Sequence, residues 1–218
     1  MPDPASQGEP PRARRMSAEK RRETILDAAL EVFAERGLAG GRLREIAARA
    51  GITEPYLFRH FTSKAKLYEA AVIEPLIRLI ERFEEQINSI PDGPPLTGAT
   101  LVREINRVIL EFMLDAIPYI GVSMFSDVTE GREFYSRQIY GRVHEPIRAL
   151  LGSIKGWPSP TVSLDLVANS MWGLNYGIAL DALHTGLTIN IDKTADRVSR
   201  LYVSGIPQFQ SPPDPTTA

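Results

Sequence analysis

The sequence contains no cysteine among its 218 residues. This absence excludes a disulfide framework, a thiolate metal site, a cysteine nucleophile and a redox sensor that works through thiols. No apolar run approaches the ~20 residues that a membrane-spanning helix needs. The N-terminal stretch MPDPASQGEPPRARRMS has no apolar segment of the kind found in secretory signals. We therefore expect a cytoplasmic protein with no membrane partner.

Histidine is scarce too, with three in the chain. So few histidines suggest no Ser-His-Asp set, and neither a phosphate loop nor a dinucleotide fingerprint is present. Asp181 and His184 are spaced i, i+3 on an expected helix, but a metal ion needs more ligands than this pair provides. The sequence therefore predicts no catalytic residue, no metal and no cofactor.

The residues that are present suit a folded chain, because 43% are hydrophobic and 24% are charged. The charge is divided unevenly. Residues 1–70 hold 13 Lys and Arg against 10 Asp and Glu, whereas residues 71–218 hold 12 against 17. A basic N-terminal region on an acidic remainder suits a protein that contacts phosphate at one end. An asymmetry of this size also arises by chance.

The chain divides into four parts. Residues 1–16 contain four prolines and three arginines and are predicted to be a disordered arm, and the proline-rich residues 206–218 a disordered tail. Between them helical periodicity dominates. We predict an all-α fold with a three-helix head over residues 17–63 and a larger helical body over residues 64–205.

About nine helices are expected from this periodicity. Their approximate ranges are 17–37, 42–50, 53–61, 64–88, 97–116, 118–127, 131–154, 161–185 and 192–204. Ser17, Thr53 and Ser63 are expected N-caps, and Gly37 is expected to end the first helix. Pro75 lies inside the fourth pattern and should kink or split that helix.

Residues 42–61, RLREIAARAGITEPYLFRHF, have the form of a helix-turn-helix. Two short helices that cross steeply need small side chains at their contact, which Ala47 and Ala50 provide, while Gly51 permits the turn. Leu57, Phe58 and Phe61 are expected to face inward. The second helix then presents its polar side chains to a DNA major groove. An ordinary helical hairpin is the alternative interpretation.

The segment from residue 21 to residue 72 resembles the DNA-binding head of the tetracycline-repressor (TetR) family. The shared features are IL-x-AA-x-x-x-F-x-x-x-G in the first helix, I-A-x-x-A-G-I-T, and x-L-F-x-H-F-x-S-K-x-x-L. This match covers about a quarter of the chain. The resemblance implies a homodimeric transcriptional regulator of double-stranded operator DNA, usually a repressor that a small ligand releases.

The resemblance also implies which residues contact DNA. They are Arg42, Arg44, Thr53, Glu54, Pro55, Tyr56, Phe58, His60 and Lys64. Arg42 replaces the usual capping Ser or Thr, and Phe58 lacks the hydroxyl of the usual Tyr. Glu54 either accepts from a cytosine amino group or caps its helix away from the duplex. Outside the match, Arg12, Arg14 and Arg15 either reach a minor groove or only solubilise the arm.

The resembled family usually pairs its last two helices with their copies to form a dimer. Here the candidate interface residues are Ala168, Gly173, Gly177, Val198, Leu201 and Tyr202. The alternative is that both helices pack within one subunit. Dimerisation is favoured because two heads spaced about 34–36 Å apart match adjacent major grooves.

A ligand pocket is expected in the body. Its candidate lining residues are Phe83, Asn106, Phe112, Met113, Tyr119, Phe125, Phe134, Tyr140, His144, Asn169, Trp172, Asn175 and Tyr176. Together they suit a mostly apolar small molecule with a few polar anchors, although each aromatic ring also suits ordinary core packing. Two other functions stay open: an enzyme or carrier whose DNA head is vestigial, and an architectural DNA-binding protein without a ligand.

Overall fold

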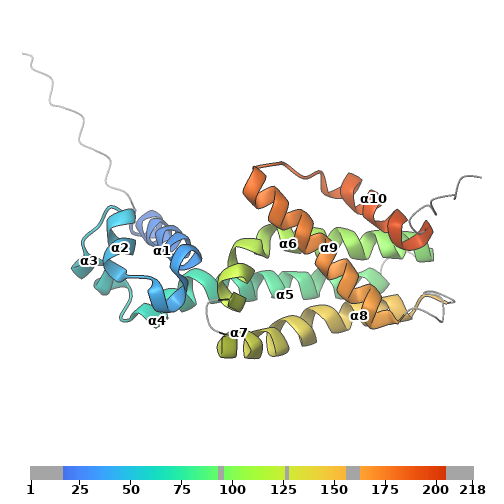
Figure 1. The fold of residues 1–218 in the computed structure, drawn as a ribbon, viewed down its shortest axis with the longest axis horizontal. Helices are drawn as coiled ribbons and strands as arrows, with labels where there is room; N and C mark the ends of the chain where they lie inside the picture. Colours follow the sequence, from blue (N-terminus) through green and yellow to red (C-terminus); the bar gives the residue numbers. More distant parts are fainter. Residues whose placement is uncertain (1–16, 93–95, 126–127, 156–162, 205–218) are drawn as a thin grey trace, which may run out of the picture.

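The computed structural model describes residues 17–92, 96–125, 128–155 and 163–204. These residues form helices and turns and include no strand, so the predicted all-α class is confirmed. A small N-terminal head lies at one end of an elongated helical body (Figure 1). The predicted arm (1–16) and the predicted tail (206–218) lie outside the described residues.

The head is built from a long helix, α1 (Ala18–Gly40), and three short helical segments, α2 (Leu43–Arg49), α3 (Glu54–His60) and α4 (Lys64–Tyr68). The side chains of Ser17 and Ser63 accept from the amides of Lys20 and Lys66, which confirms two predicted N-caps. Gly37 adopts φ +67° and interrupts the helical backbone where the first helix was expected to end. Gly supplies this conformation without the steric cost of a Cβ.

The body follows without a break from α4. Its elements are the π-helical η1 (Glu69–Ile73), α5 (Glu74–Ser89), the 3₁₀ turn η2 (Ile90–Asp92), α6 (Gly98–Phe125), α7 (Val128–Phe134), the π-helical η3 (Tyr135–His144), α8 (Glu145–Gly152), α9 (Leu164–Thr185) and α10 (Ile191–Ser204). The α4–η1–α5 and α7–η3–α8 stretches are continuous. The described residues therefore contain eight continuous helices, close to the nine expected.

Apart from Pro55 in the first turn of α3, three prolines lie within these continuous helices, and two of them follow a π-helical segment. The π-helices η1 and η3 end at Ile73 and His144, two residues before Pro75 and Pro146. A proline cannot donate the i→i−4 hydrogen bond, and its ring clashes with that carbonyl. The wider π turn accommodates the ring, so the helix passes Pro75 without splitting.

The helix boundary predicted near Pro118 is wrong. Separate helices were expected over 97–116 and 118–127, whereas α6 runs through Pro118 as one 28-residue helix. A proline removes one backbone hydrogen bond. The residues on either side, Ile117 and Ile120, are buried in the body core. Their packing maintains the helix across the missing bond.

Two hydrophobic cores support this arrangement. The head core joins buried residues of α1 to α4 and η1, among them Phe33 and Leu57, and the body core joins α5 to α9. Val122, near the end of α6, belongs to the head core. The Tyr68 hydroxyl donates to the Val122 carbonyl oxygen at 3.4 Å. The longest body helix therefore ends inside the packing of the head, and the predicted boundary after residue 63 stays a prediction.

Candidate nucleic-acid interface and ligand sites

The turn between α2 and α3 has the geometry that the motif demands. Ala47 is 2% exposed and Ala50 is 9% exposed, so small side chains do occupy the crossing. Gly51 adopts φ +66° in the turn, a backbone conformation that favours glycine. Ile46 and Leu57 are fully buried below the crossing. These contacts fix α3 at the surface of the head.

Most predicted DNA-contacting residues are accessible. Arg42, Arg44, Thr53, Pro55, Phe58 and His60 are exposed, and Glu54, Tyr56 and Lys64 are half-buried. The expectation that Phe58 faces inward is wrong, because its side chain is 45% exposed. Leu57 and Phe61 take the inward positions, and the helical rotation turns Phe58, which directly follows Leu57, outward. Thr53 occupies the N-cap position of α3, but its side chain makes no capping hydrogen bond.

The ring of Tyr56 is held by neighbours from two helices. The Arg21 guanidinium of α1 lies 5.6 Å from the centre of this ring, and the His60 ring lies 4.9 Å from it. The Arg22 guanidinium lies 5.3 Å from the Phe61 ring in the same way. These cation–π contacts between α1 and α3 were not predicted. They orient Tyr56 at the outer surface of α3.

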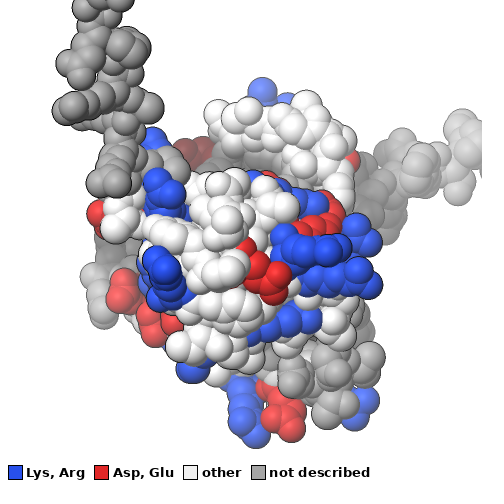
Figure 2. Space-filling view, turned by 90° about the vertical axis from the view of Figure 1, so that its left-hand side faces the viewer, with Lys and Arg blue, Asp and Glu red and all other residues white. Residues whose placement is uncertain are grey.

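Lys64 has an internal partner that the resemblance did not suggest. Its ammonium group donates to the carbonyl oxygen of Ala39 at 2.9 Å. An ammonium has three donors, so two stay available for a phosphate. Viewed end-on in Figure 2, the head carries Lys and Arg side chains around a largely uncharged centre, with Asp and Glu side chains between them.

Sequence reasoning also missed a charged cluster that joins α1 to α2. The Arg49 guanidinium contacts both carboxylate oxygens of Glu35 at 2.7 and 3.0 Å. It also lies within 3.4 Å of Glu31 and 3.5 Å of Glu45. The hydrogen bond from Arg49 lowers the pKa of the Glu35 carboxyl. The i, i+4 spacing of Glu31 and Glu35 on one helical face was the available signal.

The predicted ligand residues fall into three places, of which the first is a ladder of rings in the body. The ring centre of Phe83 in α5 lies 5.2 Å from that of Phe112 in α6. The ring centre of Phe112 lies 6.2 Å from that of Trp172 in α9. Trp172 lies 4.9 Å from His144 of η3, and His144 stacks on Tyr140 at 5.8 Å. This ring ladder connects α5, α6, α9 and η3 and runs from the body core to the surface, where Tyr140 is 43% exposed, and Met113 is buried in the same core.

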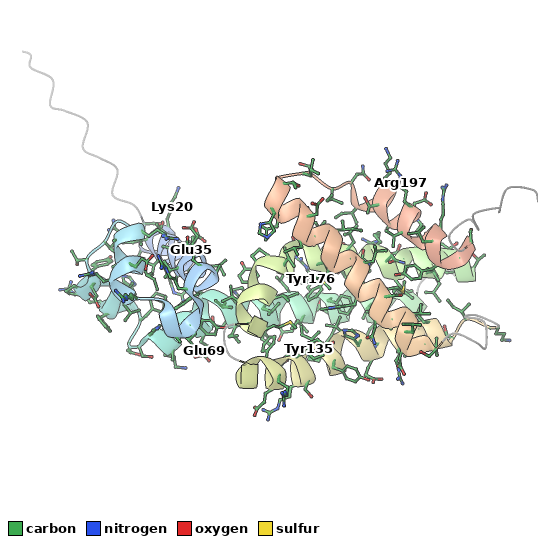
Figure 3. The ribbon with its side chains drawn as sticks, viewed as in Figure 1. Lys20, Glu35, Glu69, Tyr135, Tyr176 and Arg197 are labelled. Carbon is green, nitrogen blue, oxygen red and sulfur yellow. The ribbon has the colours of Figure 1, made fainter. Side chains whose placement is uncertain are left out.

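His144 is the polar member of the ring ladder. It is 3% exposed, and its Nε2 lies 3.5 Å from the hydroxyl of Tyr135 on the same π-helix. Burial lowers the pKa of His144, while a hydrogen bond with Asn169 and the charge of Glu145 act in the opposite direction. Figure 3 shows Tyr135 on the lower helix of the body and Tyr176 midway along α9.

The second place is a buried pair of asparagines between α6 and α9. Asn175 Nδ2 donates to Asn106 Oδ1 at 3.1 Å and to the Met171 carbonyl at 2.8 Å. Asn106 Nδ2 donates to the Val102 carbonyl at 2.9 Å. Asn175 Oδ1 is buried without a hydrogen-bond partner among the described residues. An unpaired buried acceptor is costly.

The third place is the surface of the body, where two tyrosines line separate grooves. Tyr119 lies with Arg78 and Arg82 in a groove of about 560 Å³ between α5 and α6. Tyr176 lies in a groove of about 440 Å³ between α1, α6 and α9. Of the other candidates, Phe134 is partly buried against the body core and Asn169 is exposed. Phe125 ends α6, and its side chain lies outside the described residues.

The candidate dimer residues separate by burial. Ala168 and Val198 are buried within the subunit and Tyr202 is half-buried, so these three pack inside one protomer. Gly173, Gly177 and Leu201 are exposed, and a Cβ placed at either glycine meets no atom within 4 Å. Large apolar side chains are also exposed on α9, including Leu166 and Leu174. The outer face of α9 is therefore open and partly apolar.

Two other kinds of site are absent from the described residues. None of the helices there is long and apolar enough to cross a membrane. No group of three or more His, Cys, Asp or Glu in that part of the chain is arranged to hold a metal ion.

A helix-turn-helix head on a helical body is the architecture of a DNA-binding regulator, and comparisons with known proteins agree. The family of bacterial regulatory proteins named tetR matches residues 25–71. UidR of Escherichia coli K12, an HTH-type transcriptional regulator, is 34% identical over 171 residues, which cover 75% of this chain and 82% of UidR. The chain belongs to the TetR family of transcriptional regulators.

Other relatives match over shorter stretches or by fold. The transcriptional activator FasR of Mycolicibacterium smegmatis is 36% identical over 82 residues, which span 38% of this chain and 37% of FasR. A TetR-like regulator from Rhodococcus sp. RHA1 superposes with a TM-score of 0.60 at 26% identity, covering 88% of this chain and 98% of that one. FadR from Bacillus subtilis, solved with stearoyl-CoA, has a TM-score of 0.56 at 19% identity over 84% of this chain and 98% of FadR. These proteins are transcriptional regulators rather than enzymes.

Proposed function

We propose that the protein is a homodimeric cytoplasmic repressor that binds operator DNA through α3 of each subunit. A mostly apolar small molecule that binds the body releases the DNA. The observation that carries this proposal is the geometry of the head, where α3 is fixed by Leu57 and Gly51 and exposes Phe58 and His60. A short helix held at the surface in this way fits a major groove.

The dimer is supported by the outer face of α9. One recognition helix contacts too few base pairs for a specific site, so two heads related by a twofold axis are needed. Gly173 and Gly177 leave room for close approach of a second α9, and Leu166 and Leu174 supply apolar contact. Burial of these leucines against a partner removes apolar surface from water.

The ligand is proposed to enter the body at the ring ladder. Phe83, Phe112 and Trp172 are apolar, whereas His144 and the unpaired Asn175 Oδ1 offer polar anchors. The stearoyl-CoA held by the similarly folded FadR makes a long acyl chain a reasonable first candidate. Entry of a ligand requires the rings to separate, which shifts α5 and α6 apart.

Movement of α6 would reach the head through its C-terminal end. Val122 of α6 packs in the head core, and Tyr68 donates to its carbonyl oxygen. A ligand that favours a different position of α6 then changes the relative placement of the two heads. A coupling free energy of about 1–3 kcal/mol weakens DNA binding ~5–150-fold.

Selection of genomic fragments by the purified protein tests this function, followed by gel-shift titration of a selected duplex with and without acyl-CoA thioesters. We expect a dimer that protects two half-sites spaced by about 34–36 Å. Failure to bind any duplex at low salt overturns the proposal. Binding without half-sites or ligand response indicates an architectural protein instead.

The dimer is tested by Gly177→Arg, with Gly141→Arg as the matched control. Both glycines are exposed and have no atom within 4 Å of a built Cβ, so neither arginine disturbs the subunit itself. Gly177→Arg should yield monomers in analytical ultracentrifugation and lose operator binding at least about tenfold, whereas Gly141→Arg should stay dimeric. Two dimeric variants would place the interface elsewhere.

A further inference from the structure

The groove of about 440 Å³ at the junction of head and body is separate from the ring ladder. Leu30 of α1 forms one wall, Ile117 and Val122 of α6 form the floor, and Leu180 and Leu183 of α9 form the opposite wall. Its lining is mostly apolar, and its volume lies within the range of small-molecule sites. Both the DNA head and the body therefore contribute side chains to one groove.

Gly121 keeps this groove open. It lies in the interior of α6 and lines the groove, and a Cβ built on it meets no atom within 4 Å. Glycine in a helix interior is less stable than alanine, and packing within the subunit does not require it here. The missing side chain instead leaves space beside Val122, where α6 enters the head core.

Two ionisable side chains line the groove, Glu31 and His184, and Glu31 gives its rim a negative charge. Glu31 lines it with a side chain that is 62% exposed. The ion-pair partner of Glu31 is Arg49 at 3.4 Å, but that guanidinium already contacts Glu35 at 2.7 Å. The cluster holds three carboxylates (Glu31, Glu35 and Glu45) against the guanidinium groups of Arg36 and Arg49. One carboxylate charge is thus left over for an incoming cation.

We infer that the junction groove binds an apolar small molecule that carries a single positive charge. The apolar part lies against the leucines of α1 and α9 and over Gly121, and the charge lies beside Glu31. A molecule bound there contacts the head through α1 and the body through α6 and α9. It therefore bridges the two regions next to the Val122 contact. This site requires neither DNA binding nor a ligand in the ring ladder.

Tetraphenylphosphonium and tetraphenylborate provide matched probes, because they have nearly the same shape and opposite charges. Isothermal titration of the full-length protein should show one phosphonium bound per subunit, at least about tenfold more tightly than the borate. Glu31→Gln should reduce this preference about fivefold, as expected for a partly exposed charge. Gly121→Leu fills the groove and should weaken phosphonium binding at least about tenfold.

The control variant is Gly141→Leu, which adds the same side chain at an exposed glycine on η3 that does not line the groove. Its phosphonium affinity should equal that of the unmodified protein. If Gly121→Leu does not fold, Gly121→Ala should still weaken binding while preserving the helix.

Equal affinity for the two ions, no binding, or unchanged binding by a folded Gly121 variant overturns the inference. A groove covered by a second subunit would give no binding. DNA binding is measured separately, so its failure leaves this result interpretable.

Discussion

The head and the body differ in where they keep their candidate functional side chains. In the head, Phe58, His60 and Arg44 are exposed on short helices whose buried faces are small. In the body, Phe83 and Phe112 are almost fully buried and form part of the core itself. A DNA-binding surface must face outward, so its residues differ in type from the core. A pocket for an apolar molecule uses the same residue types as the core.

The largest expected difference between the two regions concerns core truncation. Leu57 is fully buried in the head, and Ile109 is fully buried in the body. Truncation of either to alanine should lower the free energy of unfolding by about 2–5 kcal/mol. Only Leu57→Ala should also abolish DNA binding at temperatures where the protein stays folded, because Leu57 holds α3 in place. Urea denaturation and gel shifts measure the two effects. Equal loss of DNA binding in both variants would mean that the head has no independent role.

The sequence predicts the features of the head more fully than those of the body. The motif predicts Ala47, Gly51 and the outward face of α3, because the helix crossing, the turn and DNA recognition each restrict the residue type at their positions. An aromatic residue such as Phe58 suits a core, which predicts an inward position, and only the packing of Leu57 and Phe61 shows that the inward positions are taken. Local patterns carry no information on which of several apolar residues fills a limited space.

In the body, the hydrophobic periodicity predicts the helices but says little about how they pack against one another. Periodicity predicts that α9 is helical, but not that Trp172 joins Phe112 to His144. The end expected near Pro118 was wrong because tertiary packing of Ile117 and Ile120 outweighs one lost hydrogen bond. The junction groove is lined by residues that lie 150 positions apart in the sequence, such as Leu30 and Leu180, and no local spacing encodes this arrangement.

The next largest effect is expected in the head, for a variant that tests whether the Tyr56 ring recognises a base. Tyr56 is oriented by Arg21 and His60 at the surface of α3. Tyr56→Ala should cost about 1–3 kcal/mol of discrimination between the operator and a variant with one substituted base pair, if the ring contacts a base. Competition gel shifts measure this difference. Phe58→Ala provides the comparison on the same helix, and identical losses on all duplexes would assign Tyr56 to the backbone instead.

A smaller effect is expected for Lys64, which has a partner within the head. Lys64→Ala should weaken binding to all duplexes alike and lower the slope of log K against log salt by about 1, as one phosphate contact is lost. Lys66→Ala is the matched control, because Lys66 pairs with Glu69 at 2.5 Å. An unchanged slope for Lys64→Ala would mean that its bond to the Ala39 carbonyl is its main role.

The smallest expected effect lies in the body and depends on pH. Burial lowers the pKa of His144 in the folded protein below its ordinary value of 6.5. The unfolded chain therefore binds a proton more readily than the folded one, and stability falls as the pH drops below about 6.5. The slope is at most about 1.4 kcal/mol per pH unit for one proton.

His144→Phe keeps a ring against Trp172 but cannot be protonated, so its stability should fall less between pH 7.5 and pH 5.5. Parallel urea titrations of both proteins measure the difference. Tyr135→Phe, which retains His144, should keep the pH dependence of the unmodified protein. Coincident pH profiles for the unmodified protein and His144→Phe would show that the imidazole is hydrated in solution and that the ring ladder is open to water.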